Sequence, residues 1–224
     1  MEGMVNLWKS SFKDEPEYLK YEKIRKLNGE ALDSFFYFAE PNVEEYGDTI
    51  REYLNELFYN HKINIKVDIC EIDGNHFFKL LFYNFSNDGK KLSQDFLDKT
   101  RIRKQEKLNM IKSVSNGISS IFEVVKVGSK NFKTIIKDIN TNKTYEIIDT
   151  GVAYANTFMN DSIKNSLIVT NLFEYDGIYF LDNSVILNKN QPEVKQLLKD
   201  NKNYNYDFIQ FWMLAFSISS NAEM

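Results

Sequence analysis

Short apolar segments separated by turn residues follow one another from Ile121 to Leu187. Many of their positions alternate between apolar and polar residues, which is the period of a strand. The breaks recur at a spacing of roughly 8–12 residues, as is typical of a small all-strand unit. The pattern predicts a five-stranded SH3-like antiparallel barrel with strands at 122–127, 132–139, 144–148, 166–173 and 178–181.

Apolar residues that recur every three to four positions predict the helices. Pro16 suits the first turn of a helix, an apolar stripe follows from Tyr18 to Leu27, and Asn28-Gly29 is a typical stop. The short apolar segment 31–39 fits a helix or a strand equally well. Further helices are predicted at 43–59, 92–114, 192–199 and 206–219.

Between two of these helices the pattern indicates a β-hairpin. Residues 63–69 alternate strictly, Asp73-Gly74 is a turn signal, and 76–85 reads as the returning strand. The fold class is therefore predicted to be α+β. A soft boundary at Asn116-Gly117 divides a mostly helical part with one hairpin, 1–116, from the barrel with its closing helices, 117–224.

The predicted strands also carry a resemblance. The segments 122–127, 136–141, 145–149, 167–172 and 176–180 (FEVVKV, IKDINT, YEIID, LIVTNL and DGIYF) are similar to a pattern in uncharacterised bacterial proteins that often end in a SEC-C zinc motif. The resemblance covers about a third of the chain and implies no catalytic residue. The chain has no cysteine cluster, so the zinc motif itself is absent.

The composition indicates the cellular compartment and the kind of organism from which the chain comes. Cys70 is the sole cysteine, which excludes an intramolecular disulfide and a cysteine-based zinc site and suits a reducing compartment. Residues 1–8 do not resemble a signal peptide, and the apolar run 208–218 is too short to span a bilayer. We therefore expect a cytoplasmic protein. The richness in Phe, Tyr, Lys, Asn and Ile points to a low-GC bacterium or its phage.

Motifs for catalysis are absent from the sequence. It contains no phosphate-binding glycine loop, nucleophile elbow or HExxH segment. Asp68, Cys70 and His76 could meet across the predicted hairpin as metal ligands, or serve as a buried thiol and a turn histidine, and the second interpretation is the simpler one. We therefore predict no catalytic residue, no metal and no cofactor, and favour a protein that is not an enzyme.

Charge is the clearest surface signal. Residues 89–143 contain 13 Lys and Arg against 5 Asp and Glu, whereas the whole chain has a net charge of −4. A basic segment beside a small barrel could hold phosphates, with Tyr145, Phe132 or Phe173 as stacking surfaces. It could equally face the acidic helix at 43–59 or solvent. The candidate nucleic-acid-binding residues are Lys99, Arg101, Arg103, Lys104 and Lys107, three of which (99, 103 and 107) lie four apart.

The helix at 206–219 is apolar nearly all round, so it is expected to close the core, with a dimer or partner interface as the alternative. Three functional hypotheses result, of which the third is an enzyme of unrecognised type centred near Asp68, Cys70 and His76. The first is a non-enzymatic protein-binding or adaptor protein, which includes an inhibitor of a host system. The second is a nucleic-acid-binding protein that uses the basic segment 89–143.

Overall fold

A computed structural model describes residues 12–39, 52, 74–87, 89–128, 132–149, 163 and 166–221 of the chain. The described helices are α2 (Pro16–Ala39), α4 (Gly74–Asn84), α5 (Leu92–Lys99), α6 (Gln105–Ser115), α8 (Pro192–Tyr204) and α9 (Phe208–Asn221). The described strands are β1 (Ser86–Asn87), β2 (Lys90–Lys91), β3 (Ile118–Val127), β4 (Lys133–Asp138), β5 (Thr144–Ile148), β6 (Ser166–Tyr175) and β7 (Ile178–Asn188). The molecule is thus a mixed α+β protein.

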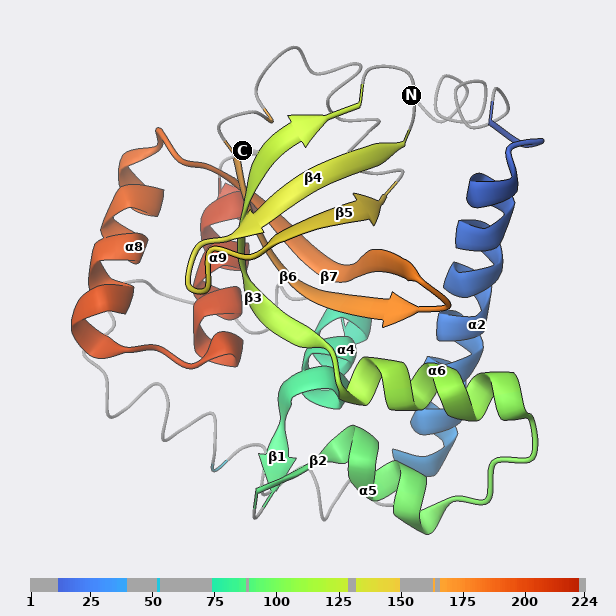
Figure 1. Ribbon diagram of the computed structural model, residues 1–224. Coiled ribbons are helices and arrows are strands. Elements are labelled where there is room, and N and C mark those ends of the chain that lie inside the picture. Colours follow the sequence, from blue (N-terminus) through green and yellow to red (C-terminus); the bar gives the residue numbers. More distant parts are fainter. Residues whose placement is uncertain are drawn as a thin grey trace.

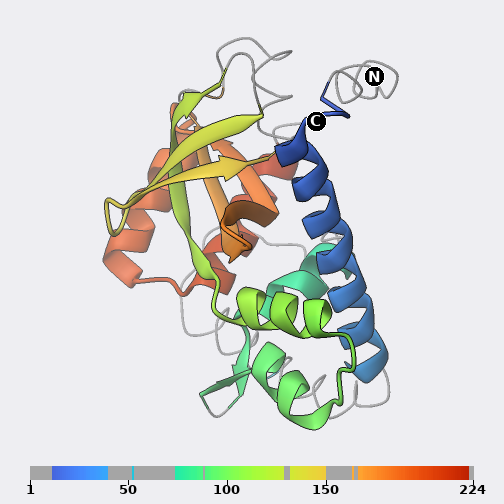
Figure 2. The ribbon, with the colours of Figure 1, turned by 45° about the vertical axis from the view of Figure 1, so that its right-hand side comes forward.

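Helices surround the five-stranded sheet. In Figure 1, α8 and α9 lie on one side of the sheet and α2 on the other, while α4, α5 and α6 lie at one end. Figure 2 shows the start of α2 beside the end of β5. The expected strand-rich unit is therefore present, with helices on both sides.

The sheet closes on itself in the order β3-β4-β5-β7-β6, with β3 pairing to both β4 and β6. Four of the neighbouring pairs are antiparallel, but β5 and β7 pair in parallel through Ile147 and Tyr179. The prediction of an entirely antiparallel barrel is therefore wrong at this closing pair. Bulges occur in β3 near Val125 and in the β6–β7 ladder, where Asn183 has a φ of 57°.

The first helix is longer than its sequence signals indicate. It continues through Asn28-Gly29 to Ala39, so the predicted stop at that dipeptide is wrong. A glycine inside a helix costs about 1 kcal/mol relative to alanine. The continuation buries Ala31 and Phe35 almost completely, which outweighs that cost.

The predicted hairpin is wrong in its second half. Residues 74–84 form helix α4 instead of a returning strand, while 63–69 lie outside the described residues. Four consecutive side chains of α4, from Leu80 to Tyr83, are buried, because α2, α5, α9 and β7 pack around this helix. A segment buried all round has no periodicity that would distinguish a helix from a strand.

The predicted helix at 92–114 is broken into α5 and α6. Thr100 has extended backbone angles, and the linker 100–104 lets Ile102 pack against the core. The break changes the direction of the chain, so residues four apart across it no longer share a helical face. The predicted helix at 43–59 falls outside the described residues, apart from the helical Glu52.

The strands have two apolar faces. One face fills the interior of the barrel with residues such as Phe122, Ile136 and Ile168. The other joins the main core beneath the helices, to which Ile121, Ile148 and Val169 belong. The main core includes residues from both sides of the predicted boundary at residue 116.

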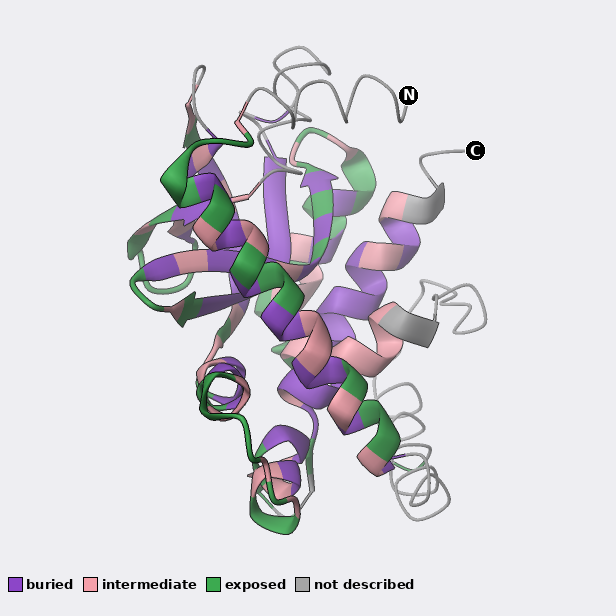
Figure 3. Ribbon diagram, turned by 90° about the vertical axis from the view of Figure 1, so that its right-hand side faces the viewer, coloured by how far each residue is buried: buried purple, intermediate pink, exposed green. Residues whose placement is uncertain are grey.

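Helix α9 is part of that core. Ile209, Phe211, Met213, Leu214 and Ala215 are buried in it, as are Trp212 and Ile218. Figure 3 shows this helix largely buried where it is described, whereas α2 is striped with exposed positions. The favoured prediction, that this helix closes the fold, agrees with this burial.

Candidate functional site

The five predicted nucleic-acid-binding residues lie around the break between α5 and α6, where the lysines are occupied within the chain. Lys99 forms an ion pair with Asp95 at 2.8 Å, and Lys104 one with Glu30 of α2 at 3.1 Å. Lys107 donates a hydrogen bond to Ser34, also on α2. The contact with Lys104 lowers the pKa of the Glu30 carboxyl. Two of the five residues, Lys104 and Lys107, therefore hold α2 against the α5–α6 unit.

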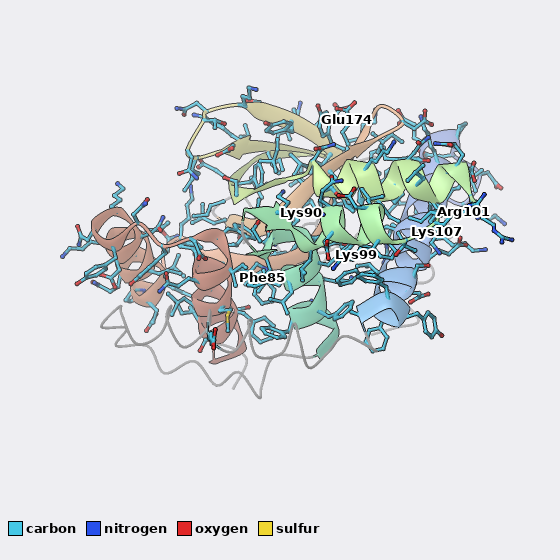
Figure 4. The ribbon with its side chains drawn as sticks, turned by 90° about the horizontal axis from the view of Figure 1, so that it is seen from below. Phe85, Lys90, Lys99, Arg101, Lys107 and Glu174 are labelled. Carbon is cyan, nitrogen blue, oxygen red and sulfur yellow. The ribbon has the colours of Figure 1, made fainter. Side chains whose placement is uncertain are left out.

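The two arginines differ from the lysines. Arg101 and Arg103 lie in the linker and are exposed, and the described residues give neither one an ion pair. Figure 4 shows Arg101 and Lys107 near the start of α6, beside α2. Since Lys99, Arg103 and Lys107 lie on three different segments, they do not form the single helical stripe that their spacing predicts.

A wide cleft of about 730 Å³ lies along α6, between that helix and the β6–β7 turn. Its lining includes Lys23 and Lys112, but also the acidic residues Glu106, Glu174 and Asp176. Lys23 pairs with Glu106 at 2.9 Å, which lowers the pKa of that carboxyl. The carboxylates would repel phosphate groups, so this cleft does not extend the basic linker into a phosphate channel.

A second basic surface lies on the outer face of the barrel. Val124 of β3 pairs with Ile136 of β4, and both side chains face the barrel interior. Ile135 and Lys137, on either side of Ile136, therefore point outward. Lys126 lies opposite Ile135 and is therefore a diagonal neighbour of Lys137, at about 7–8 Å between backbones. Lys143 follows the turn that joins β4 to β5. No ion pair is found for these three lysines among the described residues.

The carboxylates on this outer face are engaged by other lysines. Glu123 pairs with Lys189. Glu146 and Glu17 both contact Lys133, at 3.2 and 2.9 Å, and these contacts raise the pKa of that lysine. Glu123 is also the cross-strand neighbour of Lys137, although its ion pair is with Lys189. Lys126, Lys137 and Lys143 thus form no ion pair of their own among the described residues; these three residues are called the barrel lysines below.

The proposed stacking residues are mostly unavailable. Phe132 is buried against Phe12 and Tyr18, and Phe173 is buried against Tyr83 and Phe180. Tyr145 is half-buried and points inward, with its ring 5.3 Å from Tyr179. The prediction that Phe132 or Phe173 offers a surface to bases is therefore wrong, because both rings fill the core.

A buried polar centre, which sequence reasoning missed, joins α2, α4 and β7 at Asp182. Its carboxylate accepts hydrogen bonds from Tyr83 (2.6 Å), Asn28 (2.7 Å) and Lys79 (2.8 Å). The backbone N–H of Asn183 donates a fourth at 2.8 Å. Burial, with the nearby Asp182 charge next in importance, raises the pKa of the Tyr83 hydroxyl well above its ordinary value, so this hydroxyl remains a donor.

The metal hypothesis places one of its ligands on this same side of the molecule. His76 lies in the first turn of α4. Its Nδ1 lies 2.9 Å from Asn183 Oδ1, and its ring lies near Trp212 and Phe216. Asp68 and Cys70 lie outside the described residues. Within the part of the chain that the structure describes, no group of three or more His, Cys, Asp and Glu side chains could hold a metal.

Comparison with known proteins identifies a family and no activity. Residues 18–210 match the model of a family described as "Family of unknown function (DUF7986)", and the chain belongs to this family. No curated protein matches the chain, and no solved structure matches it. In the described part, no helix combines the length and apolar character needed to cross a membrane.

Proposed function

We propose that the chain is a non-enzymatic binding protein that holds single-stranded nucleic acid on the outer face of β3 and β4. One observation carries this proposal: the barrel lysines lie on β3, on β4 and just after the β4–β5 turn, and none of them forms an ion pair among the described residues. Phosphate contacts of this kind supply most of the affinity of sequence-independent binding. The proposal keeps to the basic segment 89–143 and moves the site from its first half to its second.

The strand order supports the same choice. Numbered within the barrel, the strands run 1-2-3-5-4 and return to 1, with the third and fifth parallel. We propose that the barrel is an OB-type Greek key and not the SH3-like barrel expected from the sequence. OB-type barrels bind oligonucleotides and oligosaccharides on a strand face, although a fold alone does not define an activity.

Among the described residues, α2 covers the start of β4 and leaves the end that carries the barrel lysines uncovered. At the other end of β4, Phe12 and Tyr18 cover Phe132, and Glu17 contacts Lys133. The Lys20–Asp176 ion pair, at 2.8 Å, holds the same helix α2 to the β6–β7 turn. A nucleic acid would therefore approach β3 and the β4–β5 turn, where Lys126 and Lys143 are exposed.

Fluorescence anisotropy with a labelled mixed-sequence single strand tests this proposal. Three phosphate contacts predict a slope of about −2 for log K against log salt, so binding should weaken roughly 20-fold between about 50 and 200 mM salt. The variant Lys126→Glu/Lys137→Glu should abolish binding at low salt. Absence of binding by the wild-type chain at about 50 mM salt would overturn the proposal.

The linker arginines provide the matched control. Arg101→Glu/Arg103→Glu makes the same change of charge on another exposed segment. We expect it to leave binding largely intact. If this variant abolishes binding and the barrel variant does not, the site predicted from the sequence at Lys99–Lys107 is the correct one. Circular dichroism should show that both variants keep the fold.

A protein partner is the second candidate. Val125 protrudes at the bulge of β3 with 52% of its surface exposed, directly beside Lys126. An apolar side chain next to lysines that form no ion pair among the described residues would suit an acidic protein surface. In that case Val125→Ser should weaken the complex with the partner and leave oligonucleotide binding unchanged. A cytoplasmic location, in a bacterium or its phage, belongs to both proposals.

A further inference from the structure

A small pocket of about 260 Å³ lies between α2, α4 and β7, at the rim of the polar centre around Asp182. Its polar lining comes from Arg25, Asn28 and Asp33 of α2, together with Lys79 and Asp182. The barrel lysines do not contribute to it. The pocket is therefore separate from the proposed nucleic-acid surface.

The charged side chains at the floor of the pocket neutralise each other. Lys79 and Asp182 form an ion pair at 2.8 Å, and both side chains are largely shielded from solvent. Asp182 also accepts the hydrogen bonds from Tyr83 and Asn28. These groups hold one another in place, so neither charge of the pair requires a ligand.

Asn28 is the exception in this network. It is 5% exposed, and its Nδ2 donates to both Asp182 and Tyr83. Its Oδ1 is buried and has no hydrogen-bond partner among the described residues. Leaving a buried acceptor unpaired costs about 1–3 kcal/mol. A ligand that brings a hydrogen-bond donor to this oxygen would recover that cost.

Two opposite charges flank this oxygen on α2. Arg25 and Asp33 lie two helical turns apart, about 12 Å along the axis, on either side of Asn28. Within the described part of the chain, Arg25 has a long ion pair of 3.9 Å with Glu22 and lies over the Tyr21 ring, with its Cζ 5.9 Å from the ring centre, whereas Asp33 has no ion pair. The rim thus has a positive pole and a negative pole with a free acceptor between them.

Gly29 keeps the space between these poles open. A Cβ atom built at this position meets no heavy atom within 4 Å, so the glycine is not required by crowding. Any larger side chain would project into space that the pocket shares, because Gly29 lines it. Its presence within the helix costs stability, and an open pocket is a physical reason to keep it.

We infer that this pocket binds a small zwitterion of the amino-acid type. Its ammonium group would lie toward Asp33, on the side of the unpaired Asn28 carboxamide oxygen, and its carboxylate would lie toward Arg25. A phosphate dianion is disfavoured, because the carboxylates of Asp33 and Asp182 both line the pocket. The pocket volume suits a molecule of this size, well below that of a nucleotide.

Calorimetric titration with individual free amino acids, grouped as acidic, neutral and basic, tests the inference. The same compounds with the amine acetylated or the carboxylate amidated serve as matched controls, and inorganic phosphate serves as the anion control. At least one free amino acid should bind, and blocking either end should weaken it about tenfold or more. The inference is overturned if no free amino acid binds, or if the blocked forms bind equally well.

Variants locate the site. Gly29→Leu fills the pocket, leaves every contact of Asn28 and Asp182 in place and introduces a better helix former. It should abolish binding while the unfolding midpoint stays the same or rises. Arg25→Met and Asp33→Asn should each weaken binding about tenfold. Unchanged affinity in Gly29→Leu would place the ligand elsewhere and overturn the inference, and oligonucleotide binding should be unaffected in all three variants.

Discussion

Tyr83 donates a hydrogen bond of 2.6 Å to Asp182, and this contact joins helix α4 to strand β7 across 99 residues of sequence. Asn28 of α2 contacts both groups, so three separate elements meet at one carboxylate. The Asp182 side chain is largely shielded, and a carboxylate removed from water needs its hydrogen bonds to be satisfied. The packing of the helices on the barrel therefore depends on this small set of polar contacts.

The first prediction concerns Tyr83→Phe. It removes a hydrogen bond to a charged acceptor and leaves the Asp182 carboxylate with one donor fewer, so we expect a loss of about 1.5–3 kcal/mol in the free energy of unfolding. Urea titration monitored by circular dichroism measures it. Tyr37→Phe is the control, since Tyr37 is 74% exposed and its replacement should change little. Equal stabilities for the two variants would contradict this role of Tyr83.

The second prediction is the pH dependence of the same contact. The pKa of Tyr83 is raised in the folded chain above the ordinary value of about 10, so the unfolded chain loses this proton first as pH rises. The Tyr83 contribution is complete below about pH 10 and declines above it, by at most about 1.4 kcal/mol per pH unit. The stability difference between the wild-type chain and Tyr83→Phe should therefore shrink in alkali.

The stabilities of the wild-type chain and of Tyr83→Phe must be compared at each pH, because other groups titrate in the same pH range. Burial also raises the pKa of Tyr18, Tyr175 and Tyr206, and it lowers the pKa of Lys91, which acts with the opposite sign. These contributions cancel when wild type and variant are compared at each pH. A difference that stays constant from neutral to strongly alkaline pH would show that Tyr83 ionises normally.

Two glycines give a third, paired prediction. A Cβ at Gly117 would lie 2.2 Å from the Phe173 ring, which is buried and 4.7 Å from the Tyr83 ring. Gly117→Ala should therefore cost about 1–3 kcal/mol through overpacking. Gly29→Ala meets open space inside a helix and should add up to about 1 kcal/mol. Thermal unfolding of both variants should shift in opposite directions, and a parallel shift would contradict the packing at Gly117.

The barrel strands could be predicted because their signals are local. Alternation places Phe122 and Val124 on one face, and turns such as Asp176-Gly177 mark the ends of the strands. The fifth strand was predicted too short, as it continues to Asn188 through Asn183, whose left-handed backbone forms a bulge and resembles a strand end. The parallel pairing of β5 with β7 has no local signature, because it depends on which strands become neighbours in space.

The polar centre could not be predicted for a related reason. Asn28, Tyr83 and Asp182 are far apart in the chain, and each has an ordinary local interpretation. Asn28-Gly29 resembles a helix stop, and Tyr83 falls in an apolar segment that fits a strand as well as a helix. Charge counting did find the basic segment, but it could not distinguish Lys104, which is paired, from Lys126, for which the described residues show no ion pair.

The last prediction concerns cooperativity between the barrel and the helices. Neighbouring residues of one strand serve different cores: Phe122 fills the barrel interior, whereas Ile121 joins the main core with Trp212. Phe122→Ala should cost about 3–5 kcal/mol, and because the strands are shared, both cores should unfold together. Trp212 fluorescence in a Trp8→Phe background and far-ultraviolet circular dichroism should then give coincident urea transitions that shift equally in the variant. Two separate transitions would instead show that the barrel interior unfolds independently of the main core around Trp212, and would contradict the coupling of the two cores through the strands that they share.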